Sequence, residues 1–165
     1  MVGEAEVLEE WRRSLIILHR AHWEAAGQFE DRNFWLGLTA AGMSAIAGTT
    51  VFATLEQDSP SVFVRVAVGV FSVIATLLAA IQAFLRSSAI AERHKAAGVK
   101  FGQLRRELDQ TRLVGLPTDA AAREAALKDF RKRWDEAESN VPPVPSAIFK
   151  HVSRNVARYG IDESG

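Results

Sequence analysis

Two apolar stretches decide the fold: FWLGLTAAGMSAIAGTTVFATL at residues 34–55 and VAVGVFSVIATLLAAIQAFL at residues 66–85. Neither stretch contains Asp, Glu, Lys, Arg or His. A helix rises 1.5 Å per residue, so about 20 mostly apolar residues are enough to cross a hydrocarbon core of ~30 Å. The sequence therefore predicts a hairpin of two transmembrane helices, joined by a short polar loop at residues 56–65.

The composition of the whole chain hides this hairpin. The mean hydropathy is close to zero, and 20 basic residues balance 20 acidic ones, as in an ordinary soluble domain. A soluble protein can also contain helices that are apolar all round, but this chain has no further apolar elements to bury two of them. Cysteine is absent, which excludes disulfides and thiolate chemistry. The balanced charge gives no reason to expect nucleic acid as a partner.

The distribution of charge predicts the orientation of the hairpin. The loop side carries Glu56 and Asp58, with Arg65 as its only basic residue. Basic residues gather near the other ends of both stretches: Arg20, Arg32, Arg86, Arg93, Lys95 and Lys100. Basic residues remain on the cytoplasmic side of a membrane, so we expect a two-pass protein with both termini in the cytoplasm.

The flanking sequence predicts further helices around the hairpin, in an all-α fold that forms one domain over residues 1–165. Apolar residues recur at helical spacing over residues 4–31, 86–113, 118–140 and 146–160. We expect the second span to continue into residues 86–113 as one long helix, since no proline interrupts it. The cytoplasmic helices then pack together through the residues at this spacing: Val7, Trp11, Leu15, Leu18, His22, Ala25, Phe29, Ala89, Ile90, Ala97, Phe101, Leu104, Leu108, Ala122, Ala126, Phe130, Trp134, Ile148, Val152, Val156 and Tyr159.

Asp31 and Asn33 are candidate caps that separate the first flanking helix from the first span. Thr118 or Asp119 is the candidate cap of the third cytoplasmic helix.

Small residues mark one face of the first span. Gly37, Ala41, Ser44 and Gly48 recur at steps of three and four, a spacing that lets another membrane helix approach closely. Threonines on roughly the opposite face of this span either bond their own backbone or line a wet passage. Gln82, the one amide in either span, either makes an interhelical hydrogen bond, which we favour, or faces a pore. The candidate pore-lining or gate residues are therefore Thr39, Thr50, Thr54, Gln82 and Arg86.

No enzymatic site is predicted. His19 and His22 are three residues apart on a helix, but no cysteine or carboxylate cluster completes a metal site. His94 stands alone in the sequence, and partly buried histidines between helices explain His19 and His22 better than ligation does. The sequence contains no phosphate loop and no nucleophile with an evident base, so neither a cofactor nor catalysis is expected.

Several stretches together resemble the SLATT family of two-helix membrane effectors, which are found beside nucleotide-signal synthases and sensors in bacterial conflict systems. These stretches are HRAHWEAA at residues 19–26, NFWLG at 33–37, ERHKAA at 92–97, FGQLRREL at 101–108 and PPVP at 142–145. The resemblance covers most of the chain and implies no catalytic residues.

What the resemblance implies is a homo-oligomer in the bacterial inner membrane that opens a pore or disrupts the bilayer during antiphage defence. The trigger would be a nucleotide signal or a partner protein. Because this chain carries no recognisable nucleotide sensor, the signal would reach it through a separate protein or by direct binding to its soluble helices. The alternative function is a membrane-anchored scaffold that recruits a soluble partner through its cytoplasmic helices and conducts nothing.

Overall fold

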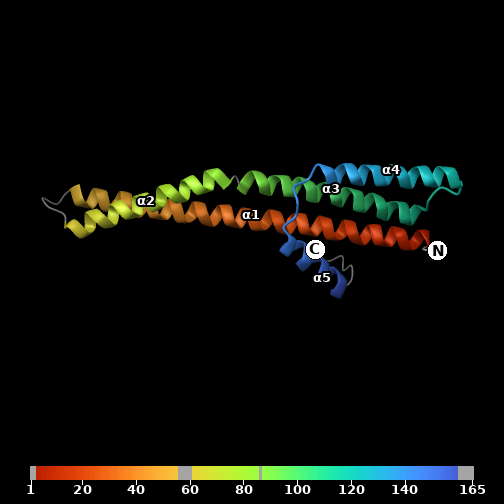
Figure 1. Ribbon diagram of the computed structural model, residues 1–165, viewed down its shortest axis with the longest axis horizontal. Coiled ribbons are helices and arrows are strands. Elements are labelled where there is room, and N and C mark those ends of the chain that lie inside the picture. Colours follow the sequence, from red (N-terminus) through yellow and green to blue (C-terminus); the bar gives the residue numbers. More distant parts are fainter. Residues whose placement is uncertain (1–2, 56–60, 86, 160–165) are drawn as a thin grey trace. The chain divides into compact units, whose positions relative to one another are not determined.

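The computed structural model describes residues 3–55, 61–85 and 87–159, with the side chains of all of these except 50–55, 82–85 and 159. These residues form five helices and no strand: α1 (Glu4–Leu55), α2 (Val62–Leu85), α3 (Ser87–Val114), α4 (Ala120–Ser139) and α5 (Ser146–Tyr159) (Figure 1). The predicted all-helical class is confirmed for the described part of the chain.

The contacts divide the chain into two compact units. Unit 1 combines residues 1–27 with residues 90–165, and unit 2 consists of residues 28–89. Unit 1 therefore contains the start of α1, most of α3, and all of α4 and α5. Unit 2 contains the rest of α1 together with α2 and the first residues of α3.

Two predicted helix boundaries differ from those observed. α1 is helical throughout Glu4–Leu55, so Asp31 and Asn33 do not end one helix and begin another. A cap needs non-helical backbone, and residues 28–36 hold neither proline nor glycine to interrupt the hydrogen-bond ladder. Where one helix was expected over residues 66–113, the structure has α2 and α3, and residue 86 between them lies outside the described residues.

The main core of unit 1 joins α1, α3 and α4. Trp11 of α1 stacks on Phe130 of α4 with ring centroids 5.7 Å apart, and its ring meets the edge of Trp134 at 6.1 Å. The buried members of this core are Leu8, Leu15, Ala97, Phe101, Leu104, Leu108, Phe130, Trp134 and Ala137. The predicted packing of the N-terminal helix against the helices that follow the second apolar stretch is thus observed in unit 1.

The apolar face of α4 is rotated from the predicted one. Phe130 and Trp134 are buried as predicted, but Ala122 and Ala126 are exposed. Ala137 is buried and Leu127 packs against the core in their place. The start of α4 agrees with the prediction, because the side chain of Asp119 accepts a hydrogen bond of 2.8 Å from the backbone N–H of Ala122.

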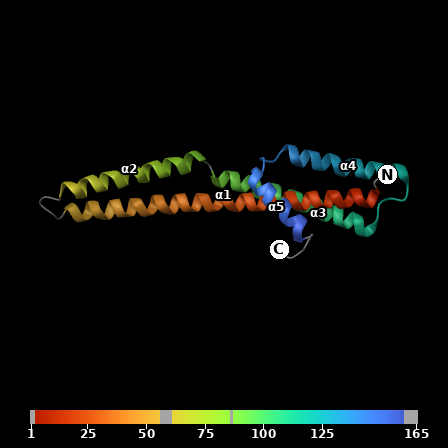
Figure 2. The ribbon, with the colours of Figure 1, turned by 60° about the horizontal axis from the view of Figure 1, so that its bottom comes forward.

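A second core lies between α1 and α5, which crosses α1 within unit 1 (Figure 2). α5 contributes Ile148, Val152 and Val156, all buried as the sequence predicts. They pack against Ile16, Ala21 and Ala25 of α1. α5 covers one side of α1, and α3 together with α4 covers another side. The start of α1 is therefore buried on a wider face than a single apolar stripe would need.

Two glycines bring α3 close to α1. A Cβ atom at Gly98 would lie 2.9 Å from Cδ1 and Nε1 of Trp23, and one at Gly102 would lie 2.9 Å from Nδ1 of His19. The same His19 nitrogen is 2.7 Å from the carbonyl oxygen of Gly98, to which it donates a hydrogen bond. The absence of side chains at these two positions therefore lets two α1 rings lie against the α3 backbone.

This close approach predicts opposite outcomes for two glycine-to-alanine changes in unit 1. Gly27→Ala should raise the free energy of unfolding by about 0.5–1 kcal/mol, because a Cβ there meets nothing within 4 Å and alanine favours the helix. Gly98→Ala should lower it by about 1–3 kcal/mol, since the Trp23 ring must move. Thermal unfolding of both variants measures this, and an equal rise in Tm for both would contradict the close approach.

Candidate functional site

The surface of α2 is the clearest functional feature of unit 2. Its segment Val62–Ile81 has a mean hydropathy of 2.3, is long enough to cross a membrane, and is only 6% buried. Large apolar side chains are exposed along it: Val62, Phe63, Val66, Val70, Phe71, Val73, Ile74, Leu77 and Ile81. An apolar surface of this length, left uncovered by the rest of the chain, supports association with a membrane.

The predicted first span is not identified in the same way. Among the described residues, Val62–Ile81 is the only segment that meets the length and hydropathy of a span, so the two-span hairpin is not confirmed. The side chains of residues 50–55, which end the first stretch, lie outside the described part. Phe34, Trp35, Leu38 and Ile46 are nonetheless exposed on it.

The predicted small-residue face is largely uncovered in this structure. Ala41 and Ser44 are exposed, and Gly37 and Gly48 are half-buried. The alanines buried within unit 2 are instead Ala40 and Ala47 of α1 and Ala75 of α2. α2 lies beside the second half of α1 in both ribbon views (Figures 1 and 2). The residues buried within this hairpin are thus neighbours of the predicted face, which remains available for other contacts.

The threonine hydroxyls of α1 and α2 bond to their own helices wherever the structure describes these side chains. Thr39 donates 2.8 Å to the carbonyl oxygen of Trp35, and Thr49 donates 2.9 Å to that of Ala45. Thr76 of α2 does the same toward Ser72 at 2.8 Å. These bonds satisfy the hydroxyls without water, as a helix in lipid requires. The side chains of Thr50, Thr54, Gln82 and Arg86, the other candidate pore-lining residues, lie outside the described part.

Unit 1 contains a buried pair of histidines. The Nδ1 atoms of His22 and His94 are 3.0 Å apart, and each residue is only 1% exposed. One ring must donate and the other accept, so the two rings carry different tautomers. The expectation of buried histidines between helices is confirmed for His22. His94, which looks isolated in the sequence, is its partner across α1 and α3, because the antiparallel packing of these helices brings residues 72 positions apart into contact.

Burial keeps this pair neutral. Desolvation, and secondly the nearby His94, lowers the pKa of His22 from 6.5 to about 4. Desolvation also lowers the pKa of His94. The His22 ring stacks on Phe101 with centroids 5.3 Å apart, so a positive charge here would be placed against an apolar core. The two neutral imidazoles, hydrogen-bonded to each other between α1 and α3, therefore have a role in packing these helices together.

The residues that the structure describes include no group of three histidine or carboxylate side chains placed to hold a metal ion. The comparisons give no further assignment, since no family model, curated protein or solved structure matches this chain.

Proposed function

We propose that this chain is an oligomeric membrane effector that forms a pore in, or otherwise disrupts, the bacterial inner membrane during antiphage defence. In this proposal residues 34–55 and 66–85 both cross the membrane and both termini lie in the cytoplasm. Unit 1 is then a cytoplasmic helical body that responds to a nucleotide signal or a partner protein.

The observation that carries the proposal is the uncovered apolar surface of α2. Burying each exposed Val, Leu, Ile or Phe side chain in lipid stabilises the inserted state by roughly 0.3–0.6 kcal/mol at the centre of a span. Val62–Ile81 contains many such residues and one basic residue, Arg65, close to its start. Lipid is the solvent in which this surface is stable.

Oligomerisation follows from the geometry of a two-helix protomer. Two helices cannot enclose a water-filled path, so a pore needs several copies around an axis. The face of Gly37, Ala41, Ser44 and Gly48 supports such contacts, because it is small and is not buried within the chain. The resemblance of the flanking sequences to the SLATT family supports the role in defence.

The test is leakage of dye from vesicles that contain the purified full chain. We expect dye release, and we expect Gly48→Leu to reduce both the release and the mass of the oligomer in detergent. Gly42→Leu is the matched control, since it makes the same change on another face of α1. A Cβ at either glycine meets nothing within 4 Å, so the new side chain starts in open space at both positions, and equal thermal unfolding curves should show that both variants are folded.

Retention of dye by vesicles holding the unaltered chain, also in the presence of its candidate trigger, would overturn the pore. That outcome would favour the alternative, a non-conducting scaffold. A scaffold should keep its function when the hairpin is replaced by two unrelated spans, whereas a pore should lose it.

A further inference from the structure

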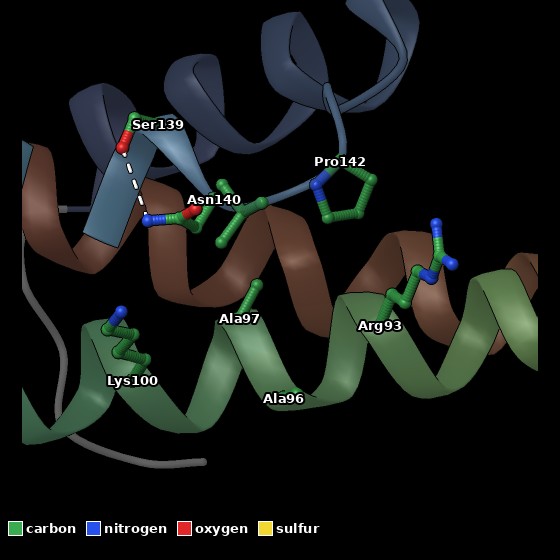
Figure 3. Close-up of a pocket in the computed structure, with 8 residues that line it drawn as sticks. Arg93, Ala96, Ala97, Lys100, Ser139, Asn140 and Pro142 are labelled. Carbon is green, nitrogen blue, oxygen red and sulfur yellow. Dashed lines mark hydrogen bonds between the residues drawn. The ribbon is translucent and has the colours of Figure 1, made fainter. Parts of the chain in front are cut away.

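A cavity of about 580 Å³ lies in unit 1 between α3 and the segment that follows α4 (Figure 3). Its lining comes from four residues of α3 and from the chain at residues 139–142: Arg93, Ala96, Ala97, Lys100, Ser139, Asn140, Val141 and Pro142. The volume is within the range of about 300–1,000 Å³ that small-molecule sites occupy.

Two positively charged residues of α3, Arg93 and Lys100, line this cavity. Arg93 and Lys100 are seven residues apart, about two helical turns, so they share one face of α3. Figure 3 shows both side chains directed from α3 toward the segment that carries Asn140 and Pro142. Ala96 and Ala97 lie between them and are too short to fill the space.

The positive charge of the cavity is not neutralised within the described part of the chain. No carboxylate lines the cavity, and no ion pair joins Arg93 or Lys100 to a described carboxylate. Other cations of unit 1 are closely paired: Arg12 with Asp109 at 2.6 Å, Arg112 with Glu9 at 2.7 Å, and Arg133 with Glu107 at 2.7 Å.

The end of α4 offsets only part of this charge. Asn140 donates a hydrogen bond of 2.8 Å to the carbonyl oxygen of Glu136, and Ser139 donates one of 3.1 Å to the same oxygen, so both side chains close the helix end. A helix C-terminus carries roughly half a negative charge. Two full positive charges exceed it, and the cavity remains a site for an anion.

We propose that this cavity, the Arg93–Lys100 pocket, binds a small phosphate-bearing molecule. Phosphate oxygens match the two separated cations, and Val141 with Pro142 offers an apolar wall to the remainder of the ligand. A bound phosphate group fastens the segment after α4 to α3. The proposal rests on the proposed function in one respect: the pocket supplies the effector with its trigger site.

The test uses pyrophosphate as a free probe and short-chain phosphatidylglycerol as a lipid probe, each titrated calorimetrically into the full chain in neutral detergent. We expect one of them to bind, and Arg93→Gln with Lys100→Gln to weaken that binding by about tenfold or more, because the double variant removes both charges that would donate hydrogen bonds to the phosphate oxygens. Binding of pyrophosphate identifies a free phosphate as the source, and selective binding of the lipid identifies a headgroup.

The matched control carries Lys150→Gln and Arg154→Gln, which remove the same charge from exposed positions on α5. Its affinity should equal that of the unaltered chain, and equal thermal unfolding curves should show that both double variants are folded. Binding of neither probe, or equal weakening by both pairs, overturns the pocket. Dye release without probe binding overturns the pocket but leaves the proposed pore standing. Probe binding without dye release supports the pocket and overturns the pore.

Discussion

Replacing Phe101 with alanine should lower the free energy of unfolding of unit 1 by about 3–5 kcal/mol, the range for deleting a large buried aromatic ring. Phe101 is fully buried in the core formed by α1, α3 and α4, and its ring stacks on His22. Removing it leaves a cavity beside Gly102, where the ring of His19 lies against α3. Urea unfolding of the full chain in mild detergent, followed by tryptophan fluorescence, measures the change, since Trp11 and Trp134 pack in the same core.

Two further variants show that the loss comes from the ring and not from the helix. Val99→Ala removes an apolar side chain from the same helix, but Val99 is 47% exposed, so its stability should change by about 0.5 kcal/mol or less. Phe101→Leu keeps most of the volume and should cost less than about 1.5 kcal/mol. A loss below about 1 kcal/mol for Phe101→Ala would show that Phe101 does not hold this core.

Acidification from neutral pH should destabilise unit 1. His22 has a pKa of about 4 in the folded chain and 6.5 when unfolded, so the unfolded state binds more protons between these pH values. The stability is complete above pH 6.5 and is lost as the pH falls toward 4. At 1.36 kcal/mol per unit, His22 alone accounts for about 2 kcal/mol between pH 7 and pH 5. His94 adds to this loss, because its pKa is also lowered.

Urea unfolding at several pH values between 7 and 5 measures this dependence. His22→Gln should remove a large part of the slope, because glutamine does not titrate. His151→Gln is the control: it makes the same change at an exposed position on α5, where His151 lies within 2.9 Å of Asn155 and outside the buried pair. An unaltered slope in His22→Gln would show that the buried pair does not control the acid sensitivity.

The sequence predicts the helices of unit 1 well because their apolar residues recur at helical spacing. Ala97, Phe101, Leu104 and Leu108 share one face of α3, and all four are buried. The start of α4 is also predictable, since an aspartate cap bonds only to its own first turn. Such local interactions need no knowledge of the rest of the chain.

Residues whose role depends on a partner element were missed or misassigned. Nothing local distinguishes Gly98 and Gly102 from glycines that merely weaken a helix, and only the contact with Trp23 and His19 shows that these positions must stay small. The cavity beside Arg93 and Lys100 likewise exists only because the segment after α4 returns to α3. The spacing of the two cations was the one signal of it that the sequence contains.

By itself the sequence determined the helical class, most helix bounds, the burial of Phe101, Leu104 and Leu108 on α3 and of Ile148, Val152 and Val156 on α5, and the apolar character of α2. It did not determine all of the buried face of α3, where Ala89 is exposed and Ala91 is buried instead. These properties depend on spacing and on local hydrogen bonds, which act over a few residues. Only the tertiary structure decided that α1 continues through Asp31, that His22 meets His94, and that α4 buries Ala137 rather than Ala122. Each of these depends on which surfaces of distant helices come into contact, and a periodic pattern does not specify the partner of a face.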